Sequence, residues 1–258
     1  MIRFESVTRK YGTKVAVDRL DLTVPPGEVF AFLGPNGAGK TSAIKMLAGL
    51  LQPTSGTVTV CGHDTATHAR DASRFLGYVP EEPFLYDKLT GREFLEFVAE
   101  MRGMTAAEKA ERIDRQVELF ELGEFFDDIT ESYSHGMRQR LVFAAAVLHD
   151  PPVLVVDEPT VGLDPKSVRM IKDLLRSKAA AGALVFMSTH TLSVAEEIAD
   201  RIGIIDRGRL NFLGTLDDLR RALCDQQHSL EHLFLELTKS NGDDRAADAG
   251  PVKPDRIS

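Results

Sequence analysis

Hydrophobic residues follow two kinds of pattern along the chain, continuous runs and alternation with polar residues. Continuous apolar runs cover 28–33, 153–156 and 184–187, as in strands that are buried on both faces of a parallel sheet. Residues 56–61 alternate threonine with valine, which suits a strand with one exposed face, and residues 40–51 are predicted to form a helix. The first sixty residues are therefore predicted to be mostly strand.

Between about residues 88 and 149 the pattern changes to that of helices. Thr90 with Glu93, and Thr105 with Glu108, have the Thr-x-x-Glu spacing of a capping box. In a capping box each of the two side chains accepts a bond from the backbone N–H of the other residue. Apolar residues then recur at roughly 3.6-residue intervals, which is the helical period. These stretches predict a helical insertion within an α/β domain.

The C-terminal part of the chain combines one helical pattern with a polar tail. The spacing of Leu230, Leu233, Phe234 and Leu237 predicts a last amphipathic helix. Residues 241–258 are rich in Gly, Pro, Ala and Asp, which predicts a disordered tail. The expected organisation is one domain over residues 1–240 followed by that tail.

Composition excludes several classes of protein. A net charge of -8 makes a nucleic-acid groove a poor expectation, because binding to phosphate backbones needs clustered Lys and Arg. Two cysteines, Cys61 and Cys224, argue against a disulfide framework and favour a reducing compartment. The apolar runs fall short of the ~20 residues that span a bilayer. We therefore expect any transport role to be shared with another polypeptide.

A complete Gly-x-x-x-x-Gly-Lys-Thr pattern lies between the first apolar run and the following predicted helix. Its glycines let backbone N–H groups turn toward phosphate oxygens, where a Cβ would block them. Lys40 adds positive charge beside the phosphates, and Thr41 offers a hydroxyl to Mg²⁺. A glycine-rich turn without a ligand is the alternative, but a strand and a helix flank the pattern as a triphosphate site requires. The expected nucleotide contacts are Gly34, Pro35, Asn36, Gly37, Ala38, Gly39, Lys40, Thr41 and Ser42.

Two carboxylates, Asp157 and Glu158, end the apolar run 153–156. Asp157 is expected to orient the metal and its water shell, and Glu158 to act as the general base for the attacking water. A strand that ends in solvated acids is common by itself, but an upstream phosphate loop favours the catalytic interpretation. Asp164 precedes Pro165 and is a natural helix N-cap, a role that can coexist with a place in the site.

Phosphate loops serve kinases, GTPases, helicases and transport ATPases alike, so these motifs leave the function open. Four further segments narrow it: 133–141, 157–159, 162–165 and 188–190. With the phosphate loop, and in this order, they resemble the nucleotide-binding subunit of an ATP-binding cassette (ABC) transporter. The resemblance runs over about residues 2–237 and nearly covers the chain.

That resemblance implies an α/β fold: a P-loop NTPase parallel-sheet core with an N-terminal antiparallel β part and a helical insertion. It implies ATP and Mg²⁺ as ligands and a head-to-tail pair of cassettes, in which Ser134 and Gly136 of one face the phosphates held by the other. Where the family has Leu-Ser-Gly-Gly-Gln, this chain has Tyr-Ser-His-Gly-Met. His135 and Met137 depart from the pattern, and Met137 is expected to lose polar contacts to the nucleotide and the backbone. A simple helix N-cap at Ser134 is the alternative.

The resemblance assigns further roles by position. His190 matches the histidine that contacts the γ-phosphate and steadies the water, and Tyr11 matches the aromatic residue that stacks on adenine. Glu81 stands where the family usually has a metal-ligating Gln, with Glu82 as a competing candidate; a carboxylate can also ligate Mg²⁺. Asp164 is expected to join the nucleotide contacts. The implied metal ligands are Thr41, Glu81 and Asp157.

Two functions remain open from the sequence. The first is an ATPase subunit at the cytoplasmic face of a membrane, bound to a second ATPase subunit and to a separate permease. The stretch 229–238 resembles the C-terminus of ATPases paired with export permeases, which favours export. The second is a soluble cassette ATPase, such as an iron–sulfur assembly subunit. No nucleic-acid partner is expected.

Overall fold

The computed structural model describes residues 1–221. Their larger sheet has the strand order β10-β9-β3-β8-β7-β6, with all neighbours parallel except the β9–β10 pair. This is the parallel core that the apolar runs predict. The strands are β3 (Val29–Leu33), β6 (Leu76–Val79), β7 (Val153–Asp157), β8 (Leu184–Thr189), β9 (Arg201–Asp206) and β10 (Arg209–Gly214).

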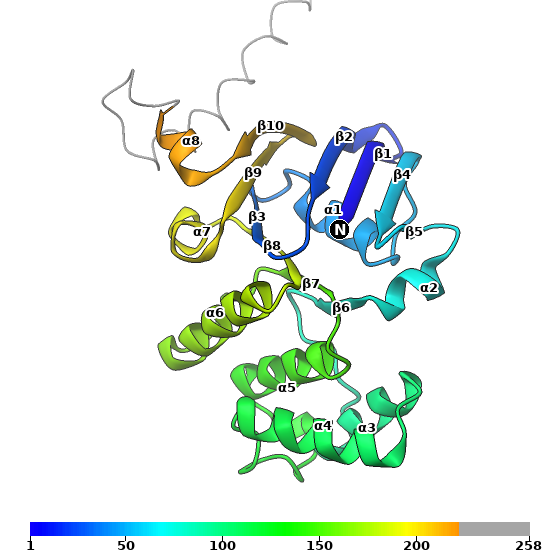
Figure 1. Cartoon of the computed structure of the whole chain (residues 1–258), viewed down its shortest axis with the longest axis vertical. Coiled ribbons are helices and arrows are strands. Elements are labelled where there is room, and N and C mark those ends of the chain that lie inside the picture. The colour runs from blue at the N-terminus through cyan, green and yellow to red at the C-terminus, as the bar shows by residue number, and fades with distance from the viewer. Residues whose placement is uncertain (222–258) are drawn as a thin grey trace, which may run out of the picture.

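A smaller antiparallel sheet has the order β2-β1-β4-β5 (Figure 1). Its presence confirms the expected N-terminal antiparallel part of the fold. In these pairings Tyr11 lies opposite Lys14, so the chain turns sharply between the first two strands. The strands are β1 (Ile2–Tyr11), β2 (Lys14–Val24), β4 (Ser55–Val60) and β5 (His63–Asp64).

Helices lie on both sides of the larger sheet. Helix α1 contacts β2 and β4 on one side and β7 and β8 on the other, and α3, α4 and α5 gather at the opposite end of the molecule from β1 and β2 (Figure 1). The helices are α1 (Lys40–Leu47), α2 (Ala69–Arg74), α3 (Gly91–Met101), α4 (Ala106–Leu119), the 3-10 turn η1 (Thr130–Ser132), α5 (His135–Val147), α6 (Pro165–Ala180), α7 (Leu192–Ile198) and α8 (Leu216–Arg221).

Both faces of the larger sheet are buried, which explains its continuous apolar runs. In β3, Val29, Ala31 and Leu33 join one hydrophobic core with α5, α6 and α7. Phe30 and Phe32 point the other way, into a second core with α1 and the antiparallel sheet. Because neighbouring residues of a strand point to opposite faces, a strand covered on both sides needs apolar residues at every position.

Both predicted capping boxes are present and start the helices where expected. The Glu93 backbone N–H donates to Thr90 Oγ1 at 3.1 Å, and the Thr90 N–H donates to Glu93 Oε2 at 2.8 Å. Thr105 and Glu108 repeat the arrangement at the start of α4. Each cap satisfies N–H groups that have no partner inside the helix, which stabilises the fold by about 1 kcal/mol.

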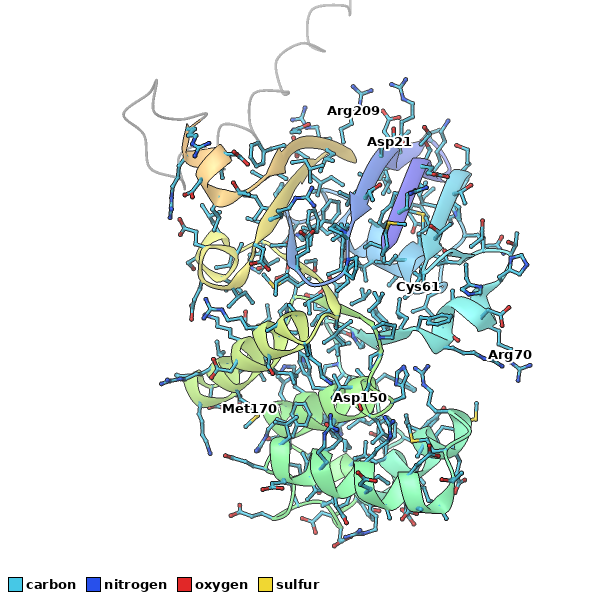
Figure 2. The ribbon with its side chains drawn as sticks, viewed as in Figure 1. Asp21, Cys61, Arg70, Asp150, Met170 and Arg209 are labelled. Carbon is cyan, nitrogen blue, oxygen red and sulfur yellow. The ribbon has the colours of Figure 1, made fainter. Side chains whose placement is uncertain are left out.

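Asp150, labelled in Figure 2, ties the helices α4 and α6 together. Its carboxylate accepts from Arg112 at 3.2 Å and Arg115 at 2.9 Å on α4, and from Lys178 at 2.9 Å on α6. Burial acts to raise the pKa of Asp150, but the hydrogen bond from Lys178 and the charges of the three cations outweigh it and lower that pKa. The carboxylate thus stays ionised and links the helical region to the sheet core.

The structure corrects one helix boundary. The prediction extended the first helix to residue 51, but α1 ends at Leu47. Gly49 has a φ of +72°, and the N–H groups of Leu50 and Leu51 both turn back to the Lys45 carbonyl, at 2.9 and 3.1 Å. Apolar periodicity carried the prediction past a glycine that ends the helix in a left-handed conformation.

Some sequence predictions lie outside the described residues. The helix expected around Leu230 to Leu237 and the tail at 241–258 both fall there. Over residues 1–221, each helix is too short or too polar to span a bilayer.

The side chain of Phe186 generates a stability prediction. Its ring is fully buried and lies 5.4 Å from Phe30 and 5.5 Å from Phe32, centroid to centroid. We expect F186A to lower the free energy of unfolding by about 3–5 kcal/mol, because it removes apolar contact and leaves a cavity. Urea unfolding monitored by circular dichroism measures this. F84A is the matched control: Phe84 is 73% exposed, and we expect a change under about 0.5 kcal/mol. Equal effects of the two substitutions would contradict the prediction.

Candidate functional site

The phosphate loop, residues 34–41, turns tightly between β3 and α1. Gly39 has a φ of +112°, and a Cβ there would lie 2.3 Å from the Ala16 carbonyl oxygen. At Gly34, a Cβ would lie 2.3 Å from the Ile205 carbonyl oxygen. A larger residue at either position would therefore move the backbone. The loop ends at the N-terminus of α1, where unpaired N–H groups favour an anion, so it fits a phosphate group.

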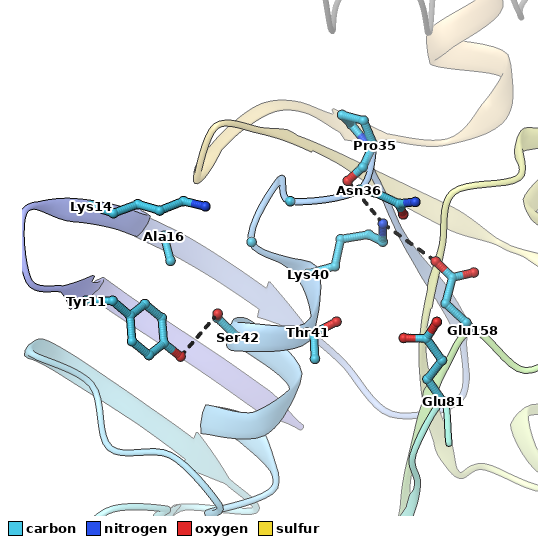
Figure 3. A pocket seen from close by; sticks show the side chains of 12 residues that line it. Tyr11, Lys14, Ala16, Pro35, Asn36, Lys40, Thr41, Ser42, Glu81 and Glu158 are labelled. Carbon is cyan, nitrogen blue, oxygen red and sulfur yellow. Dashed lines mark hydrogen bonds and ion pairs between the residues drawn. The ribbon is translucent and has the colours of Figure 1, made fainter. Parts of the chain in front are cut away.

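Lys40 is folded over this loop (Figure 3). Its Nζ donates to the Gly34 carbonyl at 2.7 Å and the Pro35 carbonyl at 3.3 Å. The same nitrogen lies 3.6 Å from Glu158 Oε1, and only about 6% of the lysine side chain is exposed. A positive charge is thus held at the mouth of the glycine loop.

Asp157 ends β7 among groups that control its charge. Ser188, opposite it on β8, donates its hydroxyl to Asp157 Oδ1. Burial raises the pKa of Asp157, and the charge of Glu158 adds to this, against the lowering effect of hydrogen bonds from Ser188 and Thr41 and of the Lys40 charge. A cation at this carboxylate would favour the ionised form, as expected of a metal ligand.

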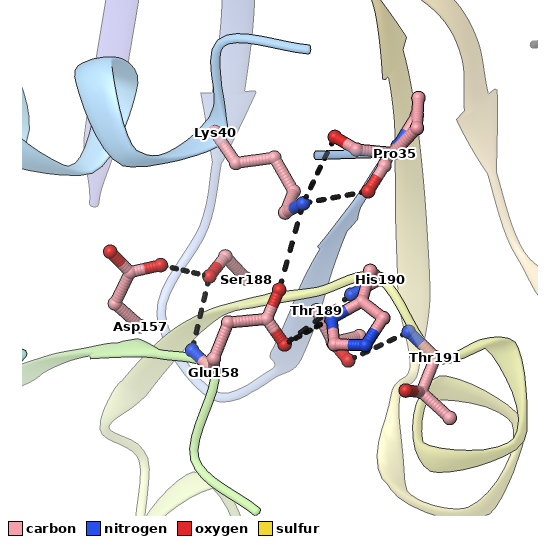
Figure 4. Close-up of polar contacts among 9 residues, drawn as sticks. Pro35, Lys40, Asp157, Glu158, Ser188, Thr189, His190 and Thr191 are labelled. Carbon is pink, nitrogen blue, oxygen red and sulfur yellow. Dashed lines mark hydrogen bonds and ion pairs between the residues drawn. The ribbon is translucent and has the colours of Figure 1, made fainter. Parts of the chain in front are cut away.

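Glu158 lies between two basic side chains (Figure 4). One carboxylate oxygen faces Lys40, and the other lies 3.0 Å from His190 Nδ1 and 3.4 Å from the His190 backbone N–H. Glu158 is buried and has a φ of +49°. A non-glycine residue in that region costs about 1–3 kcal/mol, and such strain gathers at functional sites. Its N–H donates to Ser188 Oγ at 3.2 Å, which helps to fix this conformation.

A cavity of about 360 Å³ joins Lys40 and Glu158 to the antiparallel sheet (Figure 3), and Asp157 and His190 are not among its lining residues. The Tyr11 hydroxyl lies 3.5 Å from Ser42 Oγ at its far end. Glu81 lines the cavity, and Glu82 is not among its lining residues. Gly34 and Ala38 are not among the lining residues. Gly34 instead accepts a hydrogen bond from Lys40 through its carbonyl, and Ala38 is only 2% exposed. The predicted residues that line it are Tyr11, Pro35, Asn36, Gly37, Gly39, Lys40, Thr41, Ser42, Glu81 and Glu158.

Ser134 and Gly136 are not among the residues that line this cavity. Ser134 is the exposed N-cap of α5, and its Oγ accepts from the Met137 N–H at 3.3 Å. The expectation that Met137 makes no polar contact to the backbone is wrong, because the Ser134 N–H donates to Met137 Sδ at 3.4 Å. A thioether is a weak acceptor, yet it completes the cap that a Gln would form.

The loop after Glu158 contacts the start of α5. His135 Nε2 lies 3.4 Å from the Val161 carbonyl oxygen, and its ring packs against Gly162. Asp164 caps α6: Oδ1 accepts from the Lys166 N–H at 2.9 Å and Oδ2 from Ser167 Oγ at 2.5 Å. Asp164 lines a second cavity of about 920 Å³ and is not part of the first.

Sequence reasoning missed three residues of the site. Ser188 bridges Asp157 and Glu158, and its place in Ser-Thr-His after a buried strand was a usable signal. Lys14 and Ala16 line the cavity because the β1–β2 turn brings them there, for which the sequence carries no signal. Within residues 1–221, no three His, Cys, Asp or Glu side chains are arranged to hold a metal by themselves. Mg²⁺ needs only one or two carboxylates when phosphates complete its shell, so Thr41 and Asp157 fit it.

Among the relatives that match most of the chain are two ATP-binding proteins with named roles. The daunorubicin/doxorubicin resistance ATP-binding protein DrrA of Streptomyces peucetius is 39% identical over 86% of this chain and 67% of its own length. The Nod factor export ATP-binding protein I of Cupriavidus metallidurans is 38% identical over 81% of this chain and 69% of its own length.

One solved structure shares this fold in a nucleotide-bound state. It is the dimeric post-hydrolysis state of the ATP-binding cassette MJ0796 with ADP and Pi, which superposes with a TM-score of 0.74 at 25% identity, over 84% of this chain and 99% of that one. The ABC transporter family model matches residues 17–161. With its phosphate loop, its Asp157–Glu158 pair and its exposed Ser134 cap, the chain belongs to the ABC transporter family as an ATP-binding and ATP-hydrolysing subunit.

Proposed function

We propose that this chain works as a dimer of cassettes and drives a separate transmembrane permease. One observation carries the dimer: the cavity holds Lys40 and Glu158, but Ser134 and Gly136 lie outside it, at an exposed helix start. A helix N-terminus aimed at solvent is suited to an anion held by another molecule. Each cassette then supplies half of a site, and two head-to-tail copies complete it.

Within one half-site, Lys40 holds the β- and γ-phosphates of ATP and Tyr11 takes the base. Thr41, Asp157 and Glu81 are the oxygen ligands on offer to Mg²⁺, which when bound neutralises charge on the phosphates. Ser188 holds Asp157 in place through its hydroxyl. Asp164 contributes by capping α6, at the end of the loop that follows Glu158.

Glu158 is the general base in this proposal. Its carboxylate accepts a proton from the water that attacks the γ-phosphate, and His190 orients the carboxylate through the 3.0 Å contact of Nδ1. The strained backbone of Glu158 and the Ser188 bond fix the direction of that carboxylate. Lys40 moves from its ion pair with Glu158 to the phosphates, which leaves the base free.

We expect E158Q to bind ATP with undiminished affinity and to lose turnover by at least about a hundredfold, since general-base catalysis contributes about 10²–10⁴-fold. The trapped ATP should hold the cassettes together. Equilibrium ATP binding, phosphate release and light scattering measure these three properties. K40A is the contrasting variant, and we expect it to lose binding.

Undiminished hydrolysis by E158Q would remove Glu158 from the role of base. The same experiment decides the composition of the dimer. A dimer of purified E158Q alone indicates a second copy of this chain, whereas dimerisation only with another ATPase subunit indicates a heterodimer.

Glu81 and Glu82 are distinguished by a matched pair of substitutions. Glu81 lines the cavity and Glu82 does not. We expect E81Q to raise the Mg²⁺ concentration for half-maximal ATPase activity roughly fivefold, as removal of about 1 kcal/mol of charge interaction would. We expect E82Q to leave it unchanged. A magnesium titration of ATPase activity measures both variants, and the reverse order would assign the metal contact to Glu82.

An exposed apolar surface supports a permease partner. Phe84 and Met101 are each 73% exposed, and Tyr86 packs edge-on against Phe84 and Phe97. Phe84 also lines a cavity of about 320 Å³ between α3, α5 and the sheet. Exposed apolar groups gathered in this way mark interaction sites. Glu81 lies three residues before Phe84, so one loop joins the nucleotide cavity to this surface.

We expect the full-length chain, tagged and isolated from detergent-solubilised membranes of its source organism, to capture a multi-span membrane protein. F84S should reduce that capture at least about threefold by placing a polar group in the contact. L213S is the control, because Leu213 is also exposed but lies on β10. Capture of a soluble complex without a membrane protein would favour the soluble alternative, such as iron–sulfur assembly.

With a permease as partner, the chain would act peripherally at the cytoplasmic face of the membrane. The names of the relatives, a drug resistance protein and a Nod factor export protein, support export as the direction of transport. They lend nothing to the soluble alternative.

A further inference from the structure

Besides the residues of the cavity, Tyr11 has a basic neighbour, Arg9. Arg9 and Tyr11 are two apart on β1, so their side chains lie on the same face of that strand. The guanidinium carbon of Arg9 lies 4.6 Å from the centroid of the Tyr11 ring, over its face. That is the geometry of a cation–π contact.

Arg9 is itself held firmly. Its Nη1 donates to the Gln52 carbonyl at 2.9 Å. Its Nε is buried and has no hydrogen-bond partner among residues 1–221, as expected of a guanidinium pressed against a ring. The backbone on either side is pinned to the turn before β4: the Lys10 N–H donates to Thr54 Oγ1 at 3.0 Å, and the Thr54 N–H to the Thr8 carbonyl at 2.8 Å.

Tyr11, in contrast, is 46% exposed. Its hydroxyl oxygen lies 3.5 Å from Ser42 Oγ, at the start of α1. The hydrogen bond with Ser42, and after it the neighbouring Arg9 guanidinium, lower the pKa of Tyr11 against the opposing effect of burial. Tyr11 lines the nucleotide cavity and Arg9 does not, so the guanidinium supports the ring from outside the cavity.

We propose that Arg9 is a positioning residue for the nucleotide base: it holds the ring of Tyr11 in the orientation that stacks on the base. An exposed aromatic side chain loses rotamer freedom when a ligand stacks on it, and a ring already held in place loses less. The proposal rests on the function given above, because it takes ATP to occupy the cavity with its base on Tyr11. It adds a residue that touches neither the phosphates nor the reacting atoms.

The test compares a ligand that has the base with one that lacks it. Binding of Mg-ADP and of Mg-pyrophosphate is measured by calorimetry for the wild type, R9Q and R9K; neither ligand is turned over. We expect R9Q to weaken ADP binding about two- to fivefold, the range of a cation–π contact. We expect it to leave pyrophosphate binding unchanged. R9K keeps a cation over the ring and should retain ADP binding within about twofold of the wild type.

Three further variants complete the design. R3Q removes the same charge from an exposed site on the same strand, where Arg3 pairs with Glu5, and should affect neither ligand. In a Y11A background, R9Q should have no further effect on ADP. K40A should abolish the binding of both ligands. Unchanged affinity of K40A for pyrophosphate would overturn the phosphate-loop assignment, separately from the proposal for Arg9.

An equal loss of ADP and pyrophosphate affinity in R9Q would overturn the proposal, because it would indicate a general effect of charge or folding. A full effect of R9Q in the Y11A background would also overturn it. The thermal unfolding midpoint of each variant is recorded beside the binding data. Should R9Q be unfolded, the comparison of R9K with Y11A decides: R9K affinity for ADP as low as that of Y11A would contradict the positioning role.

Discussion

The buried charge of Lys40 is the constraint on which the rest of the site depends. A lysine with about 6% of its side chain exposed needs compensation, which comes from the Gly34 carbonyl at 2.7 Å and Glu158 at 3.6 Å. Gly34 directly follows β3 and Glu158 directly follows β7, two strands that both pair with β8. Parallel register brings the carboxyl ends of the strands to one edge, and there the loop, the acids and His190 meet. The two hydrophobic cores, one on each face of the sheet, hold these strand ends in place.

The same architecture brings Lys40, Glu158 and His190 together but places Ser134 elsewhere. Ser134 is carried by α5, packed in the core on the far face of the sheet. His135 contacts the Val161 carbonyl and Gly162, in the loop that follows Glu158. The position of the exposed cap is therefore tied to the loop that follows Glu158. In the dimer that we propose, this short contact would connect Glu158 with the surface that faces the second cassette.

Most of the fold and most of the cavity lining could be predicted, for identifiable reasons. Motifs whose chemistry is local, such as the glycine loop and the capping boxes at Thr90 and Thr105, are written in adjacent residues. Contacts made by strand pairing are not, which is why Lys14 was missed, and why the bridge from Ser188 to Asp157 was missed although its Ser-Thr-His segment was a usable signal. The Met137 cap was missed because residue-type rules treat a thioether as apolar, whereas the backbone of α5 brings its sulfur to the Ser134 N–H at 3.4 Å. The end of α1 depended on one left-handed glycine that the apolar period hides.

Glu81 shows how the charges of the site constrain its ligand. The charged residues that line the cavity are Lys14, Lys40, Glu81 and Glu158, so the two signs balance before Asp157 is counted. Burial, and after it the charges of Asp157 and Glu81, raises the pKa of Tyr78 to about 12, so that phenol stays neutral and adds no charge. A nucleoside triphosphate would add several negative charges to this balance. Because carboxylates are hard oxygen ligands, we propose that Asp157 and Glu81 favour a nucleotide that arrives with a divalent cation over the free anion.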